Sequence, residues 1–202
     1  GFRDNWWLFG RRRPEMRDAF EGLTRFIATS EVSKHRVFQF LSWPESLIDG
    51  SAIGVALGNT TDLALLSGRC HILWALYMGG RMGVGDDPRY QNSLVFDPFP
   101  FPHAIDPTLL TTDPLFAQQD RLRELGERLD TFRKDRLAEH SFLTMTGLYN
   151  ALERLRELEN GCSVLPLSDA ERDVHQAGLI SVLKEIHDDI DRATLTPYGW
   201  ED

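Results

Sequence analysis

The sequence predicts an α+β protein, with a small mixed sheet and packed helices in residues 1–102 and an all-helical part in residues 103–202. Short apolar runs rich in β-branched and aromatic residues, which are typical of strands, lie in the first part. Apolar residues at helical spacing dominate the second part. Four prolines between Pro98 and Pro107 separate the two, and such a cluster favours an extended boundary segment.

The first part begins with a predicted short helix from Glu15 to Gly22. Pro14 suits its first turn, where the missing N–H of proline costs little. Two strands are expected next, at Thr24–Ala28 and Val37–Leu41. A third strand at Ala52–Leu57 is fully apolar, which indicates a central position in the sheet.

Apolar residues then recur at helical spacing from Leu63 to Tyr77 and predict a helix that packs on the sheet. Thr61 or Asp62 can cap its start, because a side-chain oxygen there accepts a bond from a free backbone N–H. Gly79 and Gly80 can end it, since glycine reaches the left-handed conformation easily. Trp74 and Tyr77 are expected in the core, whereas Arg69 and His71 lie off the apolar stripe.

A glycine-rich loop is expected over Arg81–Asp87. Ser93–Asp97 is predicted to be a short buried strand that completes the sheet, and the prolines that follow cannot continue it.

Three amphipathic helices are expected in the second part, and they predict a small bundle that braces another part of the protein. The first covers Leu115–Glu139. The second starts at Thr144 or Thr146 and breaks at Gly161. The third opens at Ser168, whose spacing to Glu171 is that of a capping box. The expected inward residues are Leu122, Leu125, Leu129 and Phe132, then Leu148, Leu152, Leu155 and Leu158, then Leu179, Leu183, Ile186, Ile190 and Ala193.

The net charge of −9 is distributed unevenly along the chain. Residues 1–100 carry no net charge, residues 1–36 have a basic excess, and all of the acidity belongs to residues 101–202. The basic excess allows phosphate contacts, although a strong basic footprint is absent. Two cysteines are too few for a disulfide framework, which favours the cytoplasm, and no apolar run has the length of a membrane span.

Several motifs that suggest catalysis fail on their context. The glycines of 79–85 resemble a phosphate loop, but such loops follow a strand and these follow a predicted helix. Asp97-Pro98-Phe99-Pro100 resembles the catalytic motif of amino-methyltransferases, whose prolines are adjacent, whereas here they are separated. His175 and His187 have no partner at metal-ligand spacing. We therefore predict no catalytic residue, no metal and no cofactor in this chain, and a free-standing hydrolase is the least favoured function.

Residue types that read DNA bases lie in or beside the glycine-rich loop. Arginine pairs with guanine, and asparagine or glutamine pairs with adenine, each through two hydrogen bonds. The candidates are Arg81, Arg89, Gln91 and Asn92. In the alternative interpretation, Arg89 pairs with Asp86 or Asp87 and Tyr90 lies in the core. Arg11, Arg12 and Arg13 are either a solvated turn or a phosphate-contacting edge.

The run RYQNSLVFDPFPFP at 89–102 contains an R-Y-x-x-(S/T) motif, an apolar stretch and an F-P-F-P exit. It resembles the end of the target-recognition region in the MmeI-like DNA methyltransferases, large single-chain enzymes of restriction–modification and phage-defence systems. The same family is matched by other segments: before this run by WWLFGRRRPEMRDAFEGLTRFIATSEVSKHR, and after it by TGLYNALERLR and YGW. The resemblance therefore covers nearly the whole chain.

This resemblance implies a target-recognition domain at 1–102 and a C-terminal helical domain at 103–202. The parent enzyme would methylate the N6 amine of adenine with S-adenosylmethionine, whose binding motif this chain lacks. The implied partners are double-stranded DNA and the upstream methyltransferase domain, with no membrane.

The family also implies roles for single residues. Base reading falls on Arg81, Arg89 and Gln91. Lys34, His35 and Arg36, in an S-K-H-R run shared with the family, would face DNA. The resemblance would turn Arg69 and His71 outward, toward DNA or a neighbouring domain. The alternative is a structural or protein-interaction module whose acidic half docks a partner without reading bases.

Overall fold

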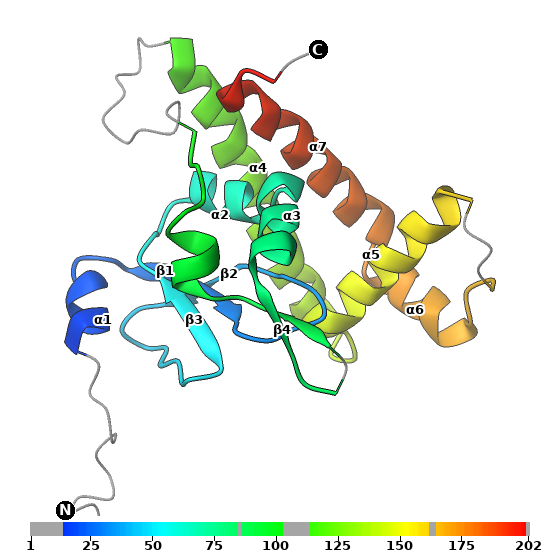
Figure 1. The fold of residues 1–202 in the computed structure, drawn as a ribbon. Helices are drawn as coiled ribbons and strands as arrows, with labels where there is room; N and C mark the ends of the chain where they lie inside the picture. The colour runs from blue at the N-terminus through cyan, green and yellow to red at the C-terminus, as the bar shows by residue number, and fades with distance from the viewer. Residues whose placement is uncertain (1–13, 85, 103–113, 162–164, 201–202) are drawn as a thin grey trace, which may run out of the picture.

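The structure, a computed structural model, describes residues 14–84, 86–102, 114–161 and 165–200 (Figure 1). Within these ranges it has a three-stranded antiparallel sheet, a two-stranded hairpin and several helices, so the predicted α+β class is confirmed. The expected mixed sheet is wrong, because every strand pair is antiparallel. No helix in the described part of the chain is both long and apolar enough to cross a membrane.

The short helix α1 (Pro14–Ala19) precedes the sheet, whose strands are β1 (Arg25–Ser30), β2 (Gln39–Ser42) and β3 (Ala52–Val55). The strand order is β2-β1-β3. The central strand is therefore β1, and the prediction that the Ala52 strand is central is wrong. Four consecutive residues of β1 are buried, whereas β3 pairs on one side only and is mostly half-buried.

The single helix expected after the sheet is divided in two, α2 (Thr60–Ser67) and α3 (Arg69–Met78). Gly68 between them is extended, with ψ 155°. The cap of α2 is Asn59, not Thr61 or Asp62, since its side chain accepts a bond from the Asp62 backbone N–H at 2.8 Å. Gly79 ends α3 as predicted, although its φ of −75° is not left-handed.

The face of α3 that meets the core differs from the prediction. His71 and Ala75 are its buried residues, while Tyr77 is 87% exposed, so the core assignment of Tyr77 is wrong. Trp74 is partly buried, and its indole N–H donates to the Val95 carbonyl at 2.8 Å. The expectation that His71 turns outward is also wrong.

The glycine-rich segment forms an antiparallel hairpin of β4 (Gly80–Met82) and β5 (Asp87–Arg89), not a plain loop. The buried strand expected at Ser93–Asp97 is wrong, because Asn92–Phe96 winds into a π-helical turn, η1. Its bonds are local, with the Val95 N–H donating to the Gln91 carbonyl at 2.8 Å. Only one side of this turn meets the core, at Val95.

The helical part contains α4 (Pro114–Glu139), α5 (Met145–Glu159), α6 (Asp169–Ala177) and α7 (Ile180–Tyr198). Thr144 caps α5, and Ser168 with Glu171 forms the capping box of α6, both as predicted. The third expected helix is divided between α6 and α7, because Leu179 adopts a left-handed φ of 46° and leaves the core.

The two parts of the chain are packed together through α2, which lies against both α4 and α7 (Figure 1). All residues of α2 are buried, and Ala64 belongs to the same apolar cluster as Leu122 and Leu125 of α4. Gly126 permits this close approach, since a Cβ there would lie 1.9 Å from the Thr60 carbonyl oxygen. The division between residues 102 and 103 stays a prediction.

Candidate nucleic-acid interface

The hairpin of β4 and β5 extends away from the sheet and the helices (Figure 1). Arg81 lies on β4 with its side chain 54% exposed. Its guanidinium donates to the Asp86 carbonyl at 3.0 Å and lies 3.7 Å from the Asp86 carboxylate. Asp86 takes a left-handed φ of 53° in the turn. Arg81 is thus tethered at the tip but remains open to solvent.

Arg89, the last residue of β5, forms an ion pair with Glu31 rather than with Asp86 or Asp87. Its Nε donates to Glu31 Oε1 at 2.8 Å, and its Nη2 lies 2.7 Å from the same oxygen. Both side chains stay partly exposed, at 37% for Arg89 and 26% for Glu31. This pair brings together residues 58 positions apart.

Gln91 and Asn92 line a groove of about 660 Å³ bordered by α1, β3 and η1. Glu31 and Asp97 also line it. Asn92 is exposed and Gln91 is half-buried, and both precede or begin the η1 turn. The structure therefore gathers Arg81, Arg89, Gln91 and Asn92 along the hairpin and the segment that leaves it.

Arg36 does not point outward as expected, because its side chain lies inside the fold with the residue 8% exposed. Its Nη1 donates to Thr29 Oγ1 at 3.1 Å and to the Ser30 carbonyl, and its Nη2 donates to the Pro88 carbonyl at 3.0 Å. Burial lowers the pKa of Arg36 to about 10, so the group stays charged at neutral pH. In this position Arg36 joins β1 to the hairpin.

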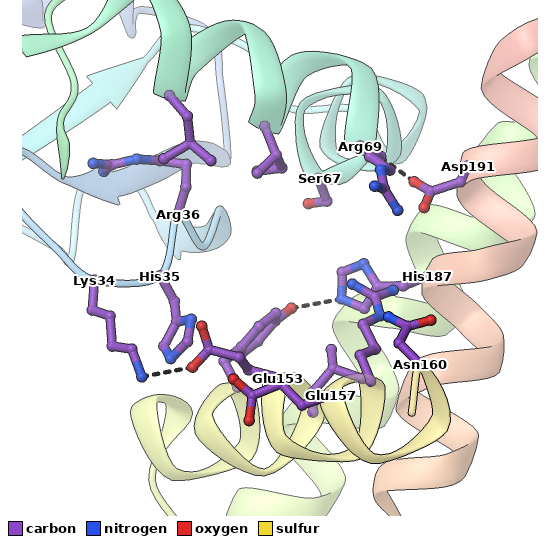
Figure 2. Close-up of a pocket in the computed structure, with 15 residues that line it drawn as sticks. Lys34, His35, Arg36, Ser67, Arg69, Glu153, Glu157, Asn160, His187 and Asp191 are labelled. Carbon is purple, nitrogen blue, oxygen red and sulfur yellow. Dashed lines mark hydrogen bonds and ion pairs between the residues drawn. The ribbon is translucent and has the colours of Figure 1, made fainter. Parts of the chain in front are cut away.

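Lys34, His35 and Arg69 line a second cavity, of about 460 Å³, between the sheet part and the helices α5 and α7 (Figure 2). Lys34 Nζ lies 2.6 Å from Glu153 Oε2, and His35 Nε2 lies 2.8 Å from the Asn150 side-chain oxygen. These contacts hold the S-K-H-R segment against α5. The Arg69 side chain is exposed, while its backbone N–H donates to Asp191 at 2.7 Å.

A polar chain of buried residues, two of which line this cavity, was not foreseen. Arg133 Nη1 donates to the Tyr149 hydroxyl at 3.1 Å, and that hydroxyl lies 2.8 Å from His187 Nε2. Burial, then the nearby Arg133 and Arg156 charges, lower the pKa of His187 to about 3, so it is neutral. These residues come from three helices, and no spacing in the sequence relates them.

Tyr90 lies in the core, as the alternative interpretation expected, with its hydroxyl 3.1 Å from His71 Nε2. Burial raises the pKa of Tyr90 and lowers that of His71 to about 4. This neutral pair holds the Arg-Tyr-Gln-Asn segment (residues 89–92) against the core. Tyr90 lies between Arg89 and Gln91, so its buried side chain anchors the backbone of both neighbours.

Arg11, Arg12 and Arg13 lie outside the described residues. Among the residues that are described, no three His, Cys, Asp or Glu side chains gather as metal ligands.

No protein-family model matches the chain, and no curated protein is significantly similar to it. Among solved structures, the fold is similar to that of MmeI, a Type IIL restriction–modification enzyme in complex with DNA. The similarity covers 90% of this chain with a TM-score of 0.58 and 17% identity, and it spans 19% of the MmeI chain. At this identity, the likeness establishes the fold.

Proposed function

We propose that this chain is the DNA sequence-recognition module of an adenine-N6 DNA methyltransferase of the restriction–modification type. The observation that carries the proposal is the fold similarity to MmeI over 90% of the chain, because that enzyme's structure is a complex with DNA. The motif resemblance at 89–102 points to the same family independently of the fold comparison.

The exposed hairpin supports base reading as the role of this module. Arg81 and Arg89 offer guanidinium groups, and Gln91 and Asn92 offer amides, which are the groups that recognise guanine and adenine edges. A two-stranded ribbon is also narrow enough to enter a major groove. We assign base reading to these four residues.

Phosphate contacts fall to cations with free access to solvent, because such contacts set the register on the duplex. We propose Arg69, which is exposed, for this role. We also propose Arg11, Arg12 and Arg13, from the sequence alone. Lys34 and His35 are held by α5, and Arg36 is buried, so we assign these three to joining elements of the fold.

The methyl transfer itself is proposed for another part of a longer parent chain. S-adenosylmethionine and the target adenine would bind in a methyltransferase domain upstream of this module, and base flipping would deliver the adenine there. We propose that the module acts in the cytoplasm.

The test is binding of the 202-residue chain to a pool of random-sequence DNA duplexes, followed by anisotropy across a salt series and sequencing of the retained fraction. We expect affinity to fall steeply with salt and one short motif to be enriched. Arg81→Ala should weaken binding to that motif by about 5- to 100-fold and weaken binding to other duplexes less.

Arg172→Ala is the matched control, because Arg172 is an exposed arginine on α6, away from the hairpin. It should leave both affinities nearly unchanged. Retention without any enriched motif would contradict sequence recognition and leave only phosphate binding.

A second function, a protein-docking module, is favoured by one observation. Leu73, Leu76 and Tyr77 are exposed on α3, and Leu76 also lines the cavity of about 460 Å³. Docking through such apolar side chains would resist salt, whereas DNA binding would not. The salt series therefore separates the two functions.

A further inference from the structure

We infer that Glu31 is a positioning residue that sets the specificity of Arg89, an inference that rests on the proposed DNA recognition. Glu31 bonds to one edge of the Arg89 guanidinium. The other end of the guanidinium then remains available to a DNA base. The carboxylate would thus decide which base Arg89 reads and how strictly.

The hydrogen bonds of the pair use one edge of the guanidinium group. A guanidinium has five N–H donors in a planar fork. Glu31 Oε1 engages the Nε and Nη2 side, at 2.8 and 2.7 Å. The two hydrogens of Nη1 and one of Nη2 then remain, and within the described residues no other partner takes them. This free end is the edge that pairs with O6 and N7 of guanine.

The backbone fixes both residues of the pair. Glu31 lies directly after β1, where its N–H donates to the Ser51 carbonyl and its own carbonyl accepts from the Tyr90 N–H, both at 2.7 Å. An antiparallel bridge joins Val32 to Arg89. The side chains therefore start from anchored positions, and little rotamer freedom is left to lose when DNA binds.

The charge of Glu31 argues for base reading rather than phosphate binding by Arg89. A carboxylate beside a guanidinium cancels most of its long-range attraction for DNA, while the directional donors remain. A cation that served only to attract phosphates would be weakened by this partner. Glu31 also lines the groove that contains Gln91 and Asn92, so the neutralised pair lies beside the amides proposed to read bases.

The test compares two variants of the full chain, each on the enriched duplex and on duplexes that differ from it at one base pair. Glu31→Gln removes the charge, and it should lower discrimination at one base pair by about tenfold while raising affinity for unrelated duplexes about two- to fivefold. Glu31→Asp keeps the charge but withdraws the oxygen by one carbon–carbon bond. It should lower discrimination without the gain in non-specific affinity.

Glu45→Gln is the control, since Glu45 is exposed and the change removes the same charge elsewhere. Thermal unfolding of each variant reports stability. A loss of discrimination with a gain in non-specific affinity for Glu31→Gln supports the inference. Loss of a merely structural ion pair would instead lower both affinities together with stability.

Two outcomes overturn it, and they are distinguishable. If the unmodified chain enriches no motif, the proposed function fails and the inference fails with it. If the unmodified chain enriches a motif, and Glu31→Gln and Glu31→Asp discriminate as strictly as it does, only the role of Glu31 is rejected. The same holds if specific and non-specific affinity both fall together with stability.

Discussion

Two arginines near the same end of the sheet illustrate how burial decides the role of a side chain. Arg36 is 8% exposed and bonds to a hydroxyl and to backbone carbonyls of β1 and the hairpin. Arg89 keeps more than a third of its side chain exposed and has one carboxylate partner. A buried guanidinium that satisfies carbonyls stabilises the fold, whereas a half-exposed one is available to a ligand.

Arg36→Met should therefore lower the free energy of unfolding by about 3 kcal/mol, because it removes the buried guanidinium that donates to Thr29 Oγ1 and to the Ser30 and Pro88 carbonyls. Urea unfolding followed by circular dichroism measures the change. Arg81→Ala, at an exposed position, should stay within about 0.5 kcal/mol of the parent chain. Equal stability of the two variants would show that Arg36 is not a structural residue.

The buried histidines predict a loss of stability in acid. Burial lowers the pKa of His71 to about 4 and that of His187 to about 3, below the value near 6.5 of an unfolded chain. The unfolded state then binds protons first, so the stabilisation is complete above pH 6.5 and is lost as pH falls toward the folded values. At pH 4.5 each histidine should cost about 2 kcal/mol.

Asp62 opposes part of this effect, because burial raises its pKa to about 6 and its contribution improves as pH falls below that value. Burial also raises the pKa of Asp191, which acts in the same direction as Asp62. Urea midpoints between pH 7.5 and 4.5 should still decrease, because the pKa values of both histidines lie further from those of the unfolded chain than the pKa of Asp62 does. His187→Asn should flatten the decrease. A stability profile that is flat over this range would mean that both imidazoles titrate normally.

Elements defined by neighbours in the sequence could be predicted, and those defined by distant contacts could not. Thr144 and Ser168 cap their helices with bonds that span three residues, so the local pattern sufficed. The turn at 92–96 has local backbone bonds too, but it also accepts a bond from the Trp74 indole, which donates to the Val95 carbonyl 21 residues away. An apolar run alone does not distinguish that turn from a buried strand.

The same distinction holds for the candidate site. The residue types at Arg81, Arg89, Gln91 and Asn92 were visible in the sequence. The partner expected for Arg89 in the alternative interpretation, Asp86 or Asp87, was wrong, because Asp86 pairs with Arg81 instead. The pairing of Arg89 with Glu31 spans 58 residues and depends on how the end of β1 meets β5. The burial of Arg36 likewise depends on the position of Pro88, 52 residues away.

The contact of α2 with α4 predicts an unusual effect of a glycine substitution. In a helix interior, alanine is more favourable than glycine by about 1 kcal/mol. At Gly126, however, a Cβ would lie 1.9 Å from the Thr60 carbonyl oxygen, so the two helices would have to separate. Gly126→Ala should lower the free energy of unfolding by about 3 kcal/mol.

Glu127→Ala is the matched control, because the neighbouring position on α4 is exposed. Its effect should stay within about 0.5 kcal/mol. If Gly126→Ala instead stabilised the chain, helix propensity would outweigh packing and the close contact of α2 with α4 would be disproved.

At the scale of the whole molecule, the sheet part and the helical part share structure that neither completes alone. Thr60 Oγ1 donates to the Arg123 carbonyl at 2.9 Å, and Arg133 Nη2 donates to the Phe38 carbonyl at 2.8 Å. The Tyr198 hydroxyl donates to the Pro100 carbonyl at 2.8 Å. These bonds cross the predicted division at 102 in three separate places, so the helices hold α2, the Phe38 segment and the Pro100 segment of the sheet part.

We therefore expect the chain to unfold in a single transition. Calorimetry should give equal calorimetric and van't Hoff enthalpies. A shortened chain that ends at Pro102 should fail to fold, because it would expose the α4-facing side of α2 and leave the Phe38 carbonyl without its donor. Two resolved transitions, or a folded 1–102 fragment, would mean that the parts are independent domains. The hairpin could then read DNA without the helices, and their role would be to bind the rest of the parent enzyme.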